Sequence, residues 1–314
     1  MKIIPQSVEL LKHDIDEYKF IEKCARTCYK SEDKITDDSA AKMVGALKKN
    51  AHYAMFEHEY LYFKLDEEWW RWFWSRFGEY TKYLNLAGYK YITGSIRAWI
   101  EFFNERTSVY GTDIDSEMML LAHNKLPLLF DKPTDVKPKH DILLLTREEY
   151  IKDASSDVLN PDNLWNTLPH TLRFTTNRGV GNELTRHRAN IGFAQESSRY
   201  VDYSADGSDN QITIIKPLIH ENDISDYNNW HYACLMAETQ YMNLRKAGVA
   251  AEIARGVLPL DCKTEIVATA TEAEWQHIIN LRYHGTTGRP HPQMKELMEM
   301  ALPILKEESN GRIQ

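Results

Sequence analysis

The chain has 314 residues, of which 43% are hydrophobic and 27% charged, a composition that supports a buried core in one large or two smaller domains. It contains no run of about 18 apolar residues, and MKIIPQSVELLKHDID at the N-terminus lacks an apolar signal region. The net charge of −8 argues against a generic nucleic-acid binder, which needs a basic surface. We therefore expect a cytoplasmic protein with neither a nucleic-acid nor a membrane partner.

The cysteine pattern predicts a reduced compartment and no metal site. Four cysteines occur without a CxxC pair, which does not fit a disulfide framework. Cys24 and Cys28 have helical spacing, and two lone thiols pack in a core more often than they bind metal.

The N-terminal half begins with helical and then strand-like patterns. Apolar spacing predicts helices over 14–28 and 36–49. Residues 53–66 are rich in aromatics and partly alternate, which predicts a strand containing His58.

Two further segments of this half are less regular. Residues 69–77 hold four of the eight tryptophans, which we interpret as a core or subunit-interface plug, with a stacking platform for a planar ligand as the alternative. A helix is expected to begin at 93–95 and to run through Phe103. From about 107 to 160, the sequence becomes polar and contains prolines, which predicts a peripheral insertion.

The C-terminal half is more regular. We expect a strand over 170–177, a short helix over 178–188 and a long amphipathic helix over 227–247. A T-x-x-E capping box at Thr271 predicts a last helix that carries Arg282 and ends at Gly285.

Positive charge gathers between residues 173 and 199, where five arginines accompany two glutamates. Such a cluster is usually a solvated charged face, but it also suits a small phosphorylated ligand. Its centre is Arg186-His187-Arg188, and Ser197, Ser198, Arg199 and Tyr200 follow shortly after.

The run HTLRFTTNRGVGNELTRHRANIGFAQESSRY resembles the signature region of flavin-dependent thymidylate synthases, in which seven residues and then Ser-x-Arg-Tyr follow RHR. Three further segments resemble the same family in the same order: CARTCYKSE at 24–32, FEH at 56–58 and ARGVLP at 254–259. Arg282 follows Arg255 at that family's spacing. The resemblance covers most of the chain outside 107–160.

The resemblance implies an α+β fold with a twisted mixed or antiparallel sheet flanked by helices. It implies one domain over 1–314 with the insertion at about 107–160, assembled as a homotetramer with shared active sites. The absence of G-x-G-x-x-G after a strand agrees, because FAD would then not be held by a Rossmann domain. The implied reaction converts dUMP to dTMP, with carbon from methylenetetrahydrofolate and hydride from FAD that NADPH reduces.

The resemblance also implies roles for single residues. Arg282 would stabilise negative charge on the uracil, and Ser197 is a second catalytic candidate, although phosphate binding suits it better than nucleophilic attack. The residues implied to bind dUMP are Glu183, Arg186, Ser197, Arg199, Arg255 and Arg282. The residues implied to contact FAD are His58, Arg186, His187, Arg188, Gln195 and His277.

The chain departs from the family pattern at three places. Eight residues, 189–196, separate Arg188 from Ser197, and we expect a bulge or shifted turn at Gly192 to absorb the extra one. Thr271 and Ala273 stand where relatives often have Asn-x-Arg. Cys28 stands where some relatives have a flavin-contacting serine.

Three alternative functions stay open. The chain could be a related pyrimidine nucleotide methylase or hydroxymethylase, or a non-catalytic nucleotide-binding paralogue. Metal-dependent hydrolysis by His170, Glu183 and His187 ranks last, because these residues lack the spacing of a metal motif.

Overall fold

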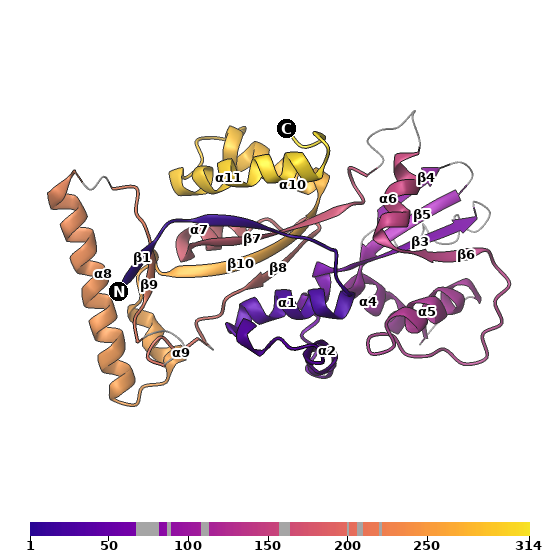
Figure 1. Ribbon diagram of the computed structural model, residues 1–314, viewed down its shortest axis with the longest axis horizontal. Coiled ribbons are helices and arrows are strands. Elements are labelled where there is room, and N and C mark those ends of the chain that lie inside the picture. Colours follow the sequence, from indigo (N-terminus) through magenta and orange to yellow (C-terminus); the bar gives the residue numbers. More distant parts are fainter. Residues whose placement is uncertain are drawn as a thin grey trace.

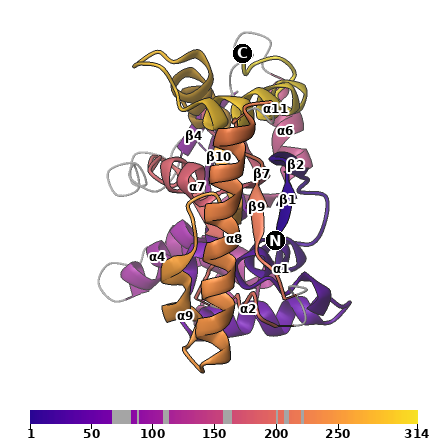
Figure 2. The same ribbon diagram turned by 90° about the vertical axis from the view of Figure 1, so that its left-hand side faces the viewer.

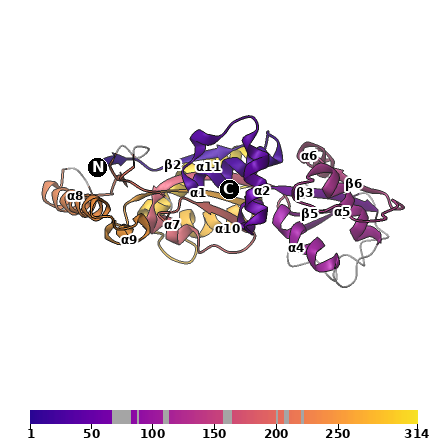
Figure 3. The same cartoon turned by 90° about the horizontal axis from the view of Figure 1, so that it is seen from below.

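A computed structural model describes residues 1–66, 82–86, 89–107, 113–156, 164–199, 201–205, 210–219 and 222–314, with main chain only for 83–86 and 105–107. The described chain is elongated, with a central layered region between two smaller groups of elements (Figures 1 and 3). The tryptophan-rich residues 69–77 and Tyr200 lie outside these ranges. Among the described helices, none is long and apolar enough to span a membrane.

A four-stranded antiparallel sheet forms the centre of the molecule, in the order β2-β7-β10-β8. Its strands are β2 (Ser7–Leu11), β7 (Pro169–Asn177), β8 (Ile191–Gln195) and β10 (Lys263–Thr271). The strand predicted at 170–177 is confirmed. Because β10 pairs with both β7 and β8, it fixes the register of the segments that resemble the signature region.

Helices cover both faces of this sheet (Figure 1). One face packs on α10 (Glu272–Ile279) and α11 (Pro292–Glu308), and the other on α1 (Glu17–Tyr29), next to α2 (Ser39–Lys49). Side chains alternate between these faces, as a strand requires. Phe174 and Ile266 join the α10 and α11 core, whereas Leu11 and Val267 pack on α1. The predicted α+β class is therefore confirmed.

A second antiparallel sheet, in the order β4-β5-β3-β6, lies at one end of the molecule, on the right in Figure 1, and packs on helices there. Its elements are β3 (Tyr60–Asp66), β4 (Lys82–Leu86), β5 (Tyr89–Ser95), α4 (Ile96–Thr107), α5 (Asp113–Lys125), β6 (Ile142–Leu145) and α6 (Arg147–Ser155). The helix predicted to start at 93–95 is α4, where Ser95 Oγ accepts from the Ala98 amide at 3.2 Å.

The segment at 107–160 is not peripheral in its described part. Strand β6 pairs with β3, and buried Met118 and Phe130 join the core that β3 and α4 form. The sequence did not reveal this packing, because the helix α5 carries acidic residues among its apolar ones. That the whole chain is one domain stays a prediction.

The third group holds the parallel pair of β1 (Lys2–Ile4) and β9 (Thr213–Ile215), together with α8 (Ile224–Lys246) and α9 (Ala251–Ala254). The predicted helix at 227–247 is confirmed. Figure 2 looks onto α8, which stands upright at this end of the molecule. Its outer side exposes the apolar residues Ile224, Tyr232, Leu235 and Met236.

Three local predictions need correction. Residues 53–58 form a 3-10 turn, Tyr53–His58, so His58 precedes the strand instead of lying in it. The helix predicted over 178–188 is α7 (Arg178–Leu184) and ends before the RHR triplet. Thr271 caps α10 without the side-chain hydrogen bond of a capping box.

Gly192 is not a bulge. It lies in the regular ladder between β8 and β10, opposite Thr269. A Cβ on Gly192 would lie 2.6 Å from the Cβ of Glu57, so this position needs glycine because the 3-10 turn packs directly on the strand. The left-handed residue of the 189–196 segment is Asn190, with φ of 50°, in the turn just before β8.

We predict that Gly192→Ala destabilises the fold by about 1–3 kcal/mol, because the added methyl forces the turn off the strand. Urea unfolding of the purified variant measures this. Gly45→Ala is the matched control: nothing lies within 4 Å of its added Cβ, and alanine favours the helix, so it should stabilise slightly. Equal stability of the Gly192 variant and the native chain would contradict the close packing.

Candidate functional site

Arg282 lies against two residues of the signature region. Helix α10 continues into a π-helical turn, Asn280–His284, which carries Arg282 and ends at Gly285 with φ of 71°. Arg282 Nε donates to His187 Nε2 at 3.0 Å, and Nη1 lies 3.5 Å from Glu183 Oε2. The turn thus brings the predicted catalytic arginine to the predicted dUMP and FAD residues.

His187 is held neutral in this cluster. Burial, the Arg282 guanidinium and the neighbouring His277 together lower its pKa to about 4. The ring of His277 lies edge-on to it, with ring centroids 6.3 Å apart. Because Nε2 of His187 accepts from Arg282, its proton belongs on Nδ1.

A cation site is geometrically present here, but Arg282 disfavours it. Ligand atoms of His187, Glu274 and His277 lie within 4.8 Å of one another. The guanidinium of Arg282, which donates to Nε2 of the same ring, would repel a second cation beside it. His170 of the alternative hydrolytic set instead contacts Glu272 at 3.0 Å, so the structure does not join that set.

Serines and arginines form a second cluster at the end of β8. We call residues 196–199 the serine loop. Arg255 Nη1 donates to Ser198 Oγ at 3.0 Å, and the Arg199 amide donates to Ser197 Oγ at 3.3 Å. Arg199 Nε lies 3.5 Å from Glu252 Oε2, and both of these side chains are more than half exposed. Such a long, exposed ion pair contributes little to stability.

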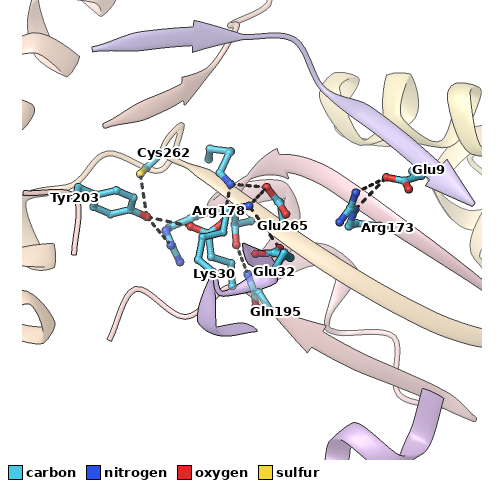
Figure 4. Close-up of polar contacts among 12 residues, drawn as sticks. Glu9, Lys30, Glu32, Arg173, Arg178, Gln195, Tyr203, Cys262 and Glu265 are labelled. Carbon is cyan, nitrogen blue, oxygen red and sulfur yellow. Dashed lines mark hydrogen bonds and ion pairs between the residues drawn. The ribbon is translucent and has the colours of Figure 1, made fainter. Parts of the chain in front are cut away.

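A cluster of lysines and glutamates anchors the start of the serine loop (Figure 4). Lys263 Nζ lies 2.8 Å from Glu196 Oε2 and 2.7 Å from Glu265 Oε1, which Lys30 also reaches. Burial works against the charge of Glu265, but the two lysines outweigh it and lower its pKa to about 2. The Ser197 amide donates to the main chain of α1. The loop therefore leaves the sheet at a fixed point.

Arg188 lines a cavity of about 290 Å³ between the central sheet and α4. Arg97 projects into it and pairs with Glu57 at 2.6 Å. Burial raises the pKa of Glu57, and Arg97 partly offsets this. Thr271, one of the departures from the family pattern, also lines this cavity.

A larger cavity of about 820 Å³ lies between α7 and the start of α11. Glu183 is on its rim, and Asn177 on its wall donates to Asp261 at 2.9 Å. Glu183 therefore borders both this cavity and the Arg282 cluster.

The predicted FAD residues do not share one cavity. His58 is fully buried under α1, where its Nδ1 lies 2.8 Å from Thr269 Oγ1. Gln195 pairs with Ile266, so its side chain lies on the face of the sheet opposite to His58. There it donates to Thr264 Oγ1. Exposed Arg186 has no ion-pair partner within the described ranges. The structure thus joins Glu183, His187, His277 and Arg282, and separately Ser197, Arg199 and Arg255.

Sequence reasoning missed two residues that shape these sites. Arg97 was passed over as an ordinary helix residue, although its spacing to Glu101 predicts an ion pair, found here at 2.8 Å. Lys263 begins the K-T-E pattern of β10, whose alternation places Lys263 and Glu265 on one face.

Fold and sites together define an antiparallel-sheet protein with arginines at two strand ends and no dinucleotide-binding motif. A sequence model of the thymidylate synthase complementing protein family matches residues 149–309. This range is more than half of the chain, and the chain belongs to that family. The resemblance found in the signature region is confirmed.

Two named relatives agree. The chain is 28% identical over 137 residues to a probable flavin-dependent thymidylate synthase of Paramecium bursaria Chlorella virus 1, an alignment covering 41% of this chain and 63% of that protein. It is 34% identical over 107 residues to the flavin-dependent thymidylate synthase of Thermococcus onnurineus (strain NA1), covering 33% and 42%. The alignments thus span less than two thirds of either relative.

Solved structures of the UMP/dUMP methylase PolB from Streptomyces cacaoi are also similar to this chain. The complex with 5-Br dUMP gives a TM-score of 0.42 at 15% identity, covering 98% of this chain and 93% of that one. The complex with 5-Br UMP gives 0.43 at 13% identity, covering 98% and 91%.

We predict that His187 makes stability fall as pH is lowered from about 6.5 to about 4. Its pKa is lowered on folding, so the unfolded chain binds the proton first, and the loss stops below the folded pKa. His187→Gln should remove about 2–3 kcal/mol of this fall, measured by urea unfolding across the pH range.

Arg282→Gln serves as the companion variant. It removes one cause of the lowered pKa, so the pH-dependent loss should become smaller than in the native chain. A His187→Gln variant with the native slope would contradict the assignment.

Proposed function

We propose that this protein is a flavin-dependent thymidylate synthase that converts dUMP to dTMP. The observation that carries the proposal is that the two C-terminal arginines implied to bind dUMP, Arg255 and Arg282, both contact residues of the signature region. Arg255 contacts Ser198, and Arg282 contacts His187 and Glu183. Family membership and the names of the two relatives support the same reaction.

In this proposal the serine loop and Arg255 bind the phosphate of dUMP. Hydroxyls and guanidinium groups suit a dianionic phosphate, especially when the arginines can present two parallel donors. The exposed position of Arg199, whose Nε lies 3.5 Å from Glu252 Oε2, is compatible with contact to a ligand from solvent. The Lys263 and Glu265 cluster keeps the loop in place, which reduces the entropy lost on binding.

Arg282 would stabilise the negative charge that develops on the uracil ring. A guanidinium stays charged throughout, so it needs no proton transfer to act. His187 accepts from Nε and leaves other guanidinium donors for substrate, while Glu183 orients Nη1. A neutral His187 is required for this arrangement, since an imidazolium would repel Arg282.

FAD would supply the hydride, NADPH would reduce it, and methylenetetrahydrofolate would supply the carbon. Arg188 and Lys82 line the same cavity and provide cationic donors that suit an anionic dinucleotide. At about 290 Å³ that cavity is at the small end for ligand sites, which commonly measure about 300–1,000 Å³. One chain would therefore hold part of the cofactor.

A composite site in a homotetramer would supply the rest. The separation of the predicted FAD residues within one chain supports this, as does the exposed apolar side of α8. We place the protein in the cytoplasm on the same proposal.

The leading alternative is a related pyrimidine nucleotide methylase or hydroxymethylase. A non-catalytic nucleotide-binding paralogue is the second alternative. Residues 191–195 of the 189–196 segment pair regularly with β10, and the longer segment beside the proposed nucleotide site is the feature that favours the leading alternative. The test is flavin absorbance of the purified protein with FAD, followed by dUMP-dependent reoxidation with methylenetetrahydrofolate and detection of dTMP. Flavin without dTMP would favour the alternative, and no flavin binding would favour the paralogue.

We predict that Arg282→Ala lowers kcat for dTMP formation by about 10²–10³, because it removes a fixed charge from the developing anion. Flavin absorbance should remain. Arg173→Ala is the control, since that arginine pairs with Glu9 on the central sheet. Normal turnover of the Arg282 variant would refute its catalytic role.

We predict that Arg199→Ala weakens dUMP binding by about tenfold to a hundredfold, because it loses a charge-assisted hydrogen bond to phosphate. Calorimetric titration with dUMP and with deoxyuridine measures this. Only dUMP affinity should fall, and unchanged affinity for both would exclude Arg199 from the phosphate site.

A further inference from the structure

A continuous row of hydrogen bonds crosses the central sheet on the face that α1 covers. Glu59 Oε1 lies 3.0 Å from His13 Nδ1, and His13 Nε2 lies 2.8 Å from Thr171 Oγ1. Thr171 Oγ1 lies 2.7 Å from Thr269 Oγ1, which lies 2.8 Å from His58 Nδ1. The row therefore runs from Glu59 through His13 and across β7 and β10 to His58, the residue that precedes Glu59 in the chain.

The last atom of the row is a buried nitrogen. His58 is fully buried, and its Nε2 has no hydrogen-bond partner among the described residues. Burying a polar atom without a partner is costly, so such atoms in folded proteins often have a function.

The carboxylate of Glu59 sets the direction of every bond in the row. A carboxylate only accepts, so the proton of neutral His13 lies on Nδ1, and its Nε2 accepts from Thr171. Thr171 Oγ1 must then accept from Thr269. Thr269 Oγ1 in turn accepts from Nδ1 of His58, which leaves Nε2 as a bare acceptor.

We propose that Glu59, His13, Thr171, Thr269 and His58 form a proton relay that takes a proton at His58 Nε2 and places the positive charge on His13. When Nε2 gains a proton, Nδ1 passes its own to Thr269. The hydroxyl proton of Thr269 passes to Thr171, and that of Thr171 passes to Nε2 of His13. One proton enters and all bonds reverse, so His58 ends neutral with its proton on Nε2.

The relay solves an electrostatic problem at His58. Burial, with His13 as a further cause, lowers the pKa of His58 to about 3, so this ring cannot hold a charge itself. His13 offers a better place for the charge, because its Nδ1 lies 3.0 Å from the carboxylate of Glu59. The transferred charge thus comes to rest beside a carboxylate.

Other charged groups also lie around His13. His13 lines a cavity of about 180 Å³ at the β2 edge, which gives the relay an outer end. The charged and titratable groups around it there are Lys12, Asp14, Arg147, Glu148, His170 and Glu308. Glu59 contacts Nδ1 of His13, the ring nitrogen that does not face Thr171.

The relay is independent of the proposed methyl transfer, because all five of its residues belong to this chain and it needs no bound ligand.

The test is nitrogen NMR of histidine tautomers in the full chain without ligand, with His58→Gln and His13→Asn identifying the signals. At high pH, His58 should carry its proton on Nδ1. As pH is lowered through the titration of His13, His58 should change to the Nε2-protonated tautomer with the same midpoint, and stay neutral.

Thr171→Val removes the middle hydroxyl with little change of shape and should uncouple the two histidines. Thr171→Ser should restore the coupling, and Thr175→Val, on the same face of β7, should leave it intact. Glu59→Gln should move both the His13 titration and the His58 tautomer change to lower pH together.

Two results would overturn the relay. One is a His58 that carries its proton on Nε2 while His13 is neutral. The other is a His58 tautomer that still follows His13 in folded Thr171→Val. Neither depends on flavin or dUMP, so loss of the proposed function would leave the relay standing.

Discussion

The pairing of β10 with β7 on one side and β8 on the other is the constraint on which the rest depends. Strand β7 leads into α7 and the RHR triplet, β8 leads into the serine loop, and β10 leads into α10 and Arg282. Three segments far apart in sequence thus leave one sheet in fixed register. A slip of one residue would turn every side chain of a strand to the other face and separate these groups.

Burial keeps three histidines neutral, and each neutral ring leaves a nitrogen that accepts. Burial lowers the pKa values of His58, His170 and His187, each within a different set of polar neighbours. At His187 the accepting nitrogen holds Arg282, and at His58 it is the end of the relay. The permanent positive charges beside His187 and beside the pair of His170 and Glu272 are those of Arg282 and Arg312, which do not titrate near neutral pH.

The sequence predicted what depends on local pattern and on short motifs. The strand at β7, the long α8 and the turn that carries Arg282 follow from apolar spacing and glycine. The link between His13 and His58 could not be predicted, because 45 positions separate them in the sequence and only the register of β7 and β10 joins them. The role of Gly192 was misjudged for the same reason, since its neighbour Glu57 comes from a distant turn.

The arrangement also indicates what a single chain lacks. Arg188 faces a cavity next to α4, the serine loop lies at the other end of β8, and His58 is enclosed beneath α1. A ligand that contacts all of them within one chain would have to pass through the sheet. A second copy that covers the apolar side of α8 would add protein at the serine-loop end, because α9 and Arg255 directly follow that helix. This geometry is the physical argument for the composite site that we propose.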